Sequence, residues 1–195
     1  MVSDTPVILA FDTSAAHCAA ALLRGDQCVV ARAEDMGRGQ AERLMPLLTE
    51  VLESGGATWA DLDRIAVGIG PGNFTGIRIS VSAARGLALA LDVPAVGVSN
   101  FEVAMVGRDA THLACIPGPR GLSYIQPPGG GPRLADDDAI AALGLTRAGL
   151  PDAAQLAETI ARIGAKADTG TPPAPLYVKP ADAAPSRDAP PVILE

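Results

Sequence analysis

The chain has 195 residues, of which 48% are hydrophobic, so it can bury the core of one domain of moderate size or of two small ones. With 15 Lys and Arg against 22 Asp and Glu, its formal charge is −7, and no basic run marks a surface that would bind DNA or tRNA unaided. Aromatic residues make up only 3% of the chain, which also argues against a base-stacking surface.

The three cysteines, Cys18, Cys28 and Cys115, form no CxxC pair, and we expect buried free thiols. In the expected hairpin around Gly25, Cys18 would face Ala33.

The first residues lack the basic region and apolar core of a signal peptide, and no run approaches the ~18 apolar residues of a membrane span. We therefore expect a soluble, cytoplasmic protein that makes no membrane contact.

The first part of the chain predicts strands followed by an amphipathic helix. Val7–Phe11 is an apolar run, and residues 17–23 and 28–32 suit a hairpin, so the three segments should form an antiparallel meander. A helix is predicted over residues 40–54, with its apolar stripe inward and Gly55-Gly56 at its end. Thr58 and Asp61 are candidate caps of a short connector.

Residues 64–98 predict a strand, a glycine-rich turn, a long helix and a second strand. Ile65–Ile69 and Ala95–Val98 are short apolar runs typical of buried strands, and Asn73 or Thr75 can cap the helix between them. This length implies a right-handed crossover between parallel strands. From Ile77 to Leu91 the only charges are Arg78 and Arg85, so we expect the helix to need a second burial partner beyond its own sheet.

The second half of the chain is predicted to have short helices and strands joined by many loops. Ser99 or Asn100 should cap a short helix, and glycine and proline fill most of residues 117–132. The predicted helices are 101–106, 136–143 and 152–163, and the predicted strands are 112–116, 122–126 and, at a sheet edge, 176–178. We expect an N-terminal unit over 1–100, a smaller unit over 101–180 and a loosely ordered tail over 181–195.

Two features suggest phosphate binding, each with a plainer interpretation. The turn GIGPGNFTG has neither the spacing nor the lysine of a Walker A loop, and a tight turn that lets two backbones approach is favoured. Asp12, Thr13 and Ser14 end the first strand, where actin-like ATPases place a metal-holding acid, but an ordinary Asx turn explains them as well. His17 and His112 lie apart and are predicted to be structural rather than metal ligands.

Five segments resemble the TsaB (YeaZ) family, glycoprotease-like proteins of tRNA threonylcarbamoyladenosine synthesis. They are LAFDTS, QAERLMPLL, AVGIGPGNFTGIRISVSAARGLALAL, PAVGVSN and PLYVKPADA, and the resemblance is strongest over residues 7–106. It implies an α/β, actin/hexokinase-like (ASKHA) fold with mixed sheets and two similar subdomains, the second shortened. It also implies a cytoplasmic subunit that binds the catalytic paralogue TsaD and the ATPase TsaE, and meets tRNA only indirectly.

The resemblance further implies that this chain is not itself the enzyme. After the second buried strand the catalytic paralogue carries His-x-x-x-His on a helix, and these two imidazoles hold its metal. Asn100 and Ala104 stand at those positions here, and alanine has no donor atom. We therefore expect no catalytic residues, no metal and no cofactor, and a scaffold that supports threonylcarbamoylation of tRNAs reading ANN codons.

In the family, the helices equivalent to residues 40–54 and 76–91 pack against the paralogue, and the same surface can pair two copies. The expected interface residues are Leu44, Met45, Leu48, Ile77, Arg78, Ile79, Val81, Ser82 and Arg85. The alternative function is a stand-alone actin-like ATP-binding phosphotransferase in which Asp12 holds magnesium. A glycopeptidase would require the absent histidine pair.

Overall fold

The computed structural model describes residues 5–178 and contains two mixed sheets. The strands are β1 Val7–Asp12, β2 His17–Arg24, β3 Gln27–Asp35, β4 Arg64–Gly68, β5 Ala95–Val98, β6 His112–Pro117, β7 Ser123–Gln126, β8 Arg133–Ala135 and β9 Thr146–Ala148. The α-helices are α1 Gln40–Ser54, α2 Phe74–Leu91, α3 Asn100–Ala104, α4 Asp137–Ala141 and α5 Ala153–Lys166, with 3-10 turns at Trp59–Asp61 and Pro119–Gly121.

The larger sheet has the strand order β3-β2-β1-β4-β5, in which β1, β2 and β3 form the predicted antiparallel meander. Strands β4 and β5 run parallel to β1, as the strand–helix–strand pattern predicts. Gly25 makes the β2–β3 turn with φ of 59°. A bulge between Leu22 and Leu23 shifts the register, so Cys18 pairs with Glu34 rather than with Ala33.

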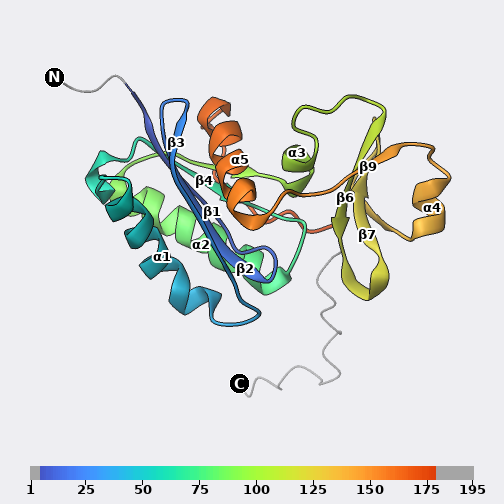
Figure 1. Cartoon of the computed structure of the whole chain (residues 1–195), viewed down its shortest axis with the longest axis horizontal. Coiled ribbons are helices and arrows are strands. Elements are labelled where there is room, and N and C mark those ends of the chain that lie inside the picture. The colour runs from blue at the N-terminus through green and yellow to red at the C-terminus, as the bar shows by residue number, and fades with distance from the viewer. Residues whose placement is uncertain (1–4, 179–195) are drawn as a thin grey trace, which may run out of the picture.

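Helices cover both faces of this sheet, with α1 and α2 on one side and α5 on the other (Figure 1). Strand β1 shows why, because its side chains alternate between the faces. Leu9 and Phe11 pack in the cluster that holds α1, whereas Ile8 and Ala10 pack with Leu156 and Ile160 of α5. A strand buried on both faces reads as one continuous apolar run in the sequence.

Helix α2 is buried on one side only. Asn73 caps it by accepting from the backbone N–H of Gly76, and Ile77, Ser80, Val81 and Ala84 face the protein interior. With 18 residues and a mean hydropathy of 1.2, the helix is long and apolar enough to span a membrane by these two criteria alone, which corrects the expectation that no segment qualifies. A core helix of a soluble protein meets the same criteria, and α2 packs on the sheet.

The smaller sheet has the strand order β8-β7-β6-β9, with β9 parallel to β6. Strands β8 and β9 were not predicted from the sequence, because three residues each are too few to show a pattern. The predicted edge strand over 176–178 is wrong. This segment has no regular structure, although the N–H of Leu176 donates to the carbonyl of Ile69. Residues 179–195, which include the predicted tail, lie outside the described residues.

The larger sheet is built from strands within residues 7–98 and the smaller sheet from strands within residues 112–148, but an element of the second half also covers the larger sheet. Helix α5 returns from the second half and packs on the larger sheet (Figure 1). There Gly164 lies against Ala66. Ala157 of the same helix packs with Ala19 and Ala21 of β2.

Candidate functional site

The glycine-rich segment after β4 lies directly against the turn between β1 and β2. A Cβ atom at Gly72 would meet the carbonyl oxygen of Ser14, and one at Gly76 would meet that of Thr13. Two hydrogen bonds fasten the contact: Asn73 N–H donates to Ser14 O at 2.6 Å, and Thr13 Oγ1 donates to Gly76 O at 2.6 Å. These glycines therefore serve the close approach of two backbones.

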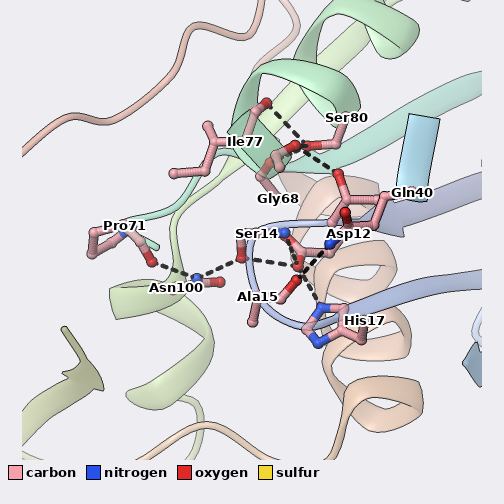
Figure 2. Close-up of polar contacts among 12 residues, drawn as sticks. Asp12, Ser14, Ala15, His17, Gln40, Gly68, Pro71, Ile77, Ser80 and Asn100 are labelled. Atoms are coloured by element: carbon pink, nitrogen blue, oxygen red, sulfur yellow. Dashed lines mark hydrogen bonds and ion pairs between the residues drawn. The ribbon is translucent and has the colours of Figure 1, made fainter. Parts of the chain in front are cut away.

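Asp12 is fully buried at the end of β1 and one of its carboxylate oxygens is saturated. Oδ1 accepts from the N–H of Ser14 at 2.8 Å, from Ser14 Oγ at 2.9 Å and from His17 Nε2 at 2.7 Å (Figure 2). The bond to the N–H of Ser14 is the predicted Asx turn. Oδ2 has no partner and lies against Gly68, where no side chain would fit.

Asn100 continues this network from the start of α3. Its Nδ2 donates to Ser14 Oγ at 3.0 Å and to the carbonyl of Pro71 at 2.9 Å, which fixes the orientation of the amide because a carbonyl only accepts (Figure 2). Its side-chain oxygen Oδ1 is buried without a partner. Ser99 caps α3 in a capping box with Glu102, and so holds Asn100 at the first helical position.

A cleft of about 660 Å³ opens beside this network, between the two sheets. Ser14 of the β1–β2 turn, His17 of β2 and Asn100 of α3 line one side of it, and β6, β7 and the segment before α5 line the other side. Its other lining residues are Ala15, Pro71, Gly72, Asn73, Cys115, Ile116, Pro117, Gly118, Pro119, Tyr124, Gly149, Leu150, Pro151, Ala153 and Leu156. Burial raises the pKa of the Cys115 thiol, so this group stays protonated near neutral pH.

The predicted phosphate-contacting residues Asp12, Thr13 and Ser14 lie together, but their side chains are buried and engaged inside the protein. A magnesium–nucleotide does not fit them. Asp12 Oδ1 already accepts three hydrogen bonds and Oδ2 is covered by Gly68, so neither oxygen is open to a cation. The described lining of the cleft includes no Lys or Arg to balance the phosphates.

The resemblance places two metal-binding histidines of the catalytic paralogue TsaD at positions where this chain has Asn100 and Ala104. Asn100 belongs to the polar network, and Ala104 packs in an apolar cluster with Phe101 and Ile116. Within residues 5–178, no group of three or more His, Cys, Asp or Glu side chains is arranged to hold a metal.

The predicted partner interface separates into two groups. Leu44, Leu48, Ile77 and Val81 are at most 3% exposed and pack mainly in the protein's own interior, although Val81 also lines a surface pocket with Arg78 and Arg85. The sequence pattern marked them as apolar, and apolar residues of an amphipathic helix face the sheet first. Met45, Arg78, Ser82 and Arg85 are exposed and Ile79 is partly buried. The structure adds Leu89, which is 88% exposed.

Sequence reasoning missed one contact of the site and one contact on the surface of α2. The pairing of His17 with Asp12 depends on the β1–β2 turn, and the separate analysis of each residue gave no signal for it. Phe74 and Arg78 of α2 both contact Tyr177. Arg78 Nε donates to the tyrosine oxygen at 2.9 Å, and the ring centroids of Phe74 and Tyr177 are 4.9 Å apart. An alternating pattern of two strands predicts the turn, but not which side chains meet across it.

Sequence comparisons agree with the motifs of the first half. The family model described as TsaD, tRNA N6-adenosine threonylcarbamoyltransferase, matches residues 33–119. The tRNA threonylcarbamoyladenosine biosynthesis protein TsaB of Escherichia coli (strain K12) is 40% identical over 94 residues, which are 48% of this chain and 40% of that protein. The chain spans less than half the length of the curated TsaB relatives, between 40% and 46%.

Solved structures show the same likeness over more of the chain. YeaZ from Pseudomonas aeruginosa superposes with a TM-score of 0.53 and 32% identity, covering 68% of this chain and 65% of that one. A Pseudomonas aeruginosa protein described as similar to peptidase YEAZ gives a TM-score of 0.68 at 22% identity, over 89% of this chain and 100% of that one, and shares the fold.

Two mixed sheets with a cleft between them, together with these neighbours, define an α/β protein of the actin-like (ASKHA) type. Over the parts that match, the chain is similar to the TsaB (YeaZ) proteins, at 35–40% identity to the curated TsaB relatives and 32% to YeaZ from Pseudomonas aeruginosa.

Proposed function

We propose that this chain is a non-catalytic subunit of the machinery that forms threonylcarbamoyladenosine in tRNA, and that it acts by binding a TsaD-like catalytic paralogue. The observation that carries this proposal is the start of α3, where Asn100 is tied into a structural network and Ala104 into an apolar cluster. An alanine and a hydrogen-bonded asparagine do not replace two imidazole ligands of a metal. The name of the Escherichia coli relative, a tRNA threonylcarbamoyladenosine biosynthesis protein, supports the pathway.

The surface proposed for docking is the exposed side of α1 and α2. Met45 is 40% exposed and Leu89 is 88% exposed, and both are large apolar side chains on helices that already cover one sheet face. Large apolar side chains exposed to this degree are candidates for a contact surface. Helix α2 carries Arg78 and Arg85 but no acidic residue, so a partner with carboxylates at matching positions suits it.

The catalytic paralogue is the first partner proposed, a TsaE-like ATPase the second, and a second copy of this chain the alternative occupant of the same surface. Because the chain is acidic overall, with a formal charge of −7, we propose that tRNA is bound through the partners rather than by this subunit.

The test is co-purification with the TsaD-like and TsaE-like proteins of the same organism, followed by a tRNA modification assay that omits each component in turn. Modification should require all three, and this chain alone should modify no tRNA. The variants Met45→Glu and Leu89→Glu should each weaken binding of the paralogue at least tenfold, since both place a charge in the proposed contact. Ala141→Glu on α4 is exposed outside this surface and serves as the matched control.

Complete modification without this chain would refute the proposed function. Unchanged binding by both glutamate variants would refute the docking surface while leaving the function open.

A further inference from the structure

The cleft between the sheets presents a buried acceptor that the protein leaves without a donor. Asn100 lines the cleft and is only 1% exposed. Its side-chain oxygen Oδ1 has no hydrogen-bond partner. The donors of the same amide are both used, by Ser14 and by Pro71, so the group cannot turn over to satisfy the oxygen. A buried amide oxygen without a donor is costly, and a bound molecule with an N–H or O–H group would relieve it.

His17 brings a second polar side chain to the same cleft. Its Nε2 lies 2.7 Å from Asp12 Oδ1, so Nδ1 is the ring nitrogen that this carboxylate does not engage. The ring lines the cleft beside Ser14. Asn100 and His17 both line this cleft, and a carboxamide or an amino-substituted heterocycle carries the N–H group that the unpartnered Asn100 Oδ1 can accept.

The other residues that line the cleft determine which charge and shape a ligand can have. None of the described residues that line the cleft is Asp, Glu, Lys or Arg. Tyr124, Leu150, Leu156 and several prolines form apolar walls, and about 660 Å³ is within the ~300–1,000 Å³ of small-molecule sites. A charged ligand would lose its hydration here without gaining a counter-charge.

We propose that this cleft binds an uncharged small molecule of up to nucleoside size, with an N–H donor on Asn100 Oδ1 and an apolar ring between the walls. The proposal reverses what the actin-like fold leads one to expect, because a magnesium–nucleotide finds neither an open carboxylate oxygen nor a cation in this cleft. It does not depend on the proposed function in tRNA modification.

Two matched pairs of compounds test the proposal on the full chain by saturation-transfer NMR and calorimetry. Adenosine is compared with ATP in the presence of Mg²⁺, and nicotinamide with nicotinate. One or both neutral compounds should bind saturably, and the charged member of each pair should bind at least tenfold more weakly. Binding of adenosine only or of nicotinamide only supports the proposal and identifies which N–H group the cleft accepts.

Variants locate the binding. Asn100→Leu removes the acceptor and should weaken the neutral compound about tenfold or more. Because this change also breaks a structural network, Ala15→Phe provides a second test: Ala15 is exposed, lines the cleft and would fill it. Its neighbour Ala16 is exposed outside the lining, so Ala16→Phe should leave binding unchanged.

Three results would overturn the proposal. The first is no saturable binding of either neutral compound at millimolar concentration, as expected if only water fills the cleft. The second is ATP binding as tightly as adenosine, and the third is unchanged binding by Ala15→Phe.

Discussion

The guanidinium of Arg64, at the first position of β4, donates from Nη1 to the carbonyl oxygen of Gly164 near the end of α5. The same nitrogen lies 3.1 Å from the carbonyl oxygen of Ala165 and 3.0 Å from that of Ala167. The last turn of a helix has carbonyls without intrahelical partners, and a cation there also complements the helix dipole. A side chain of the first sheet thus terminates a helix one hundred residues later in the chain.

Replacing this arginine should loosen the packing of α5 on the larger sheet. We expect Arg64→Met to lower the free energy of unfolding by about 1–3 kcal/mol, because partly buried carbonyls lose a charged donor. Arg38→Met, at an exposed position before α1, should change it by less than about 0.5 kcal/mol. Urea unfolding followed by circular dichroism measures both. Equal midpoints for the two variants would show that the cap contributes nothing.

Glycine-to-alanine substitutions on two helices should change the free energy of unfolding in opposite directions. Gly164→Ala places a methyl group against the Cβ of Ala66 on the sheet, so we expect a loss of about 1–3 kcal/mol from overpacking. Gly86→Ala on α2 meets nothing within 4 Å and should stabilise the protein by about 0.5–1 kcal/mol, because alanine has the higher helix propensity. Thermal unfolding of the two variants gives the comparison. Stabilisation by Gly164→Ala would contradict the close approach of α5 to β4.

The larger sheet could be predicted from sequence because its signals are local. Val7–Phe11 and Ala95–Val98 are continuous apolar runs, and Asn73 stands immediately before the long helix that it caps. Helix α1 begins and ends at the predicted residues, since Gly55 follows its last turn. The register of β2 and β3 was wrong beyond the bulge, because an inserted residue leaves no mark in an alternating pattern.

Long-range placement could not be predicted in this way. An amphipathic pattern shows that α5 has an apolar face, but not that the face covers the sheet of the other half. For the same reason the sequence could not show that the fold buries Leu44 and Val81, two predicted interface residues, to within 3% of full burial. In the candidate site, the sequence indicated Asp12, Ser14 and Asn100 separately. Only the fold brings Asn100 onto Ser14, which is 86 residues earlier.

The buried thiol of β2 should be unreactive until the protein unfolds. Burial, followed by the charge of Glu34, raises the pKa of Cys18 to about 11, so almost no thiolate exists at neutral pH. All three cysteines are free, and Cys28 and Cys115 are only partly buried. We expect two thiols to react slowly with a maleimide in the native protein and all three to react in denaturant. Mass spectrometry that finds Cys18 labelled in the folded protein would contradict its burial.

Asp109, in the segment before β6, should stabilise the folded protein by an amount that depends on pH. The hydroxyl of Thr111, then His112 and the Thr111 N–H, lower the pKa of Asp109 from its usual 3.8 to about 2. The unfolded chain therefore binds this proton at higher pH than the folded one, so the contribution is complete above about pH 4 and is lost as the pH falls towards 2. Asp109→Asn should lose less stability than the wild type between pH 5 and pH 2.5, measured by urea unfolding.

Thr111→Val provides the matched test of the cause, because it removes the hydroxyl donor at nearly constant volume. Its pKa at Asp109 should rise towards the usual value, and its acid dependence should lie between those of the wild type and Asp109→Asn. Direct titration of the Asp109 carboxyl by NMR distinguishes this effect from other carboxylates that titrate in the same range. An unchanged titration in Thr111→Val would mean that the hydroxyl does not hold the carboxylate in solution.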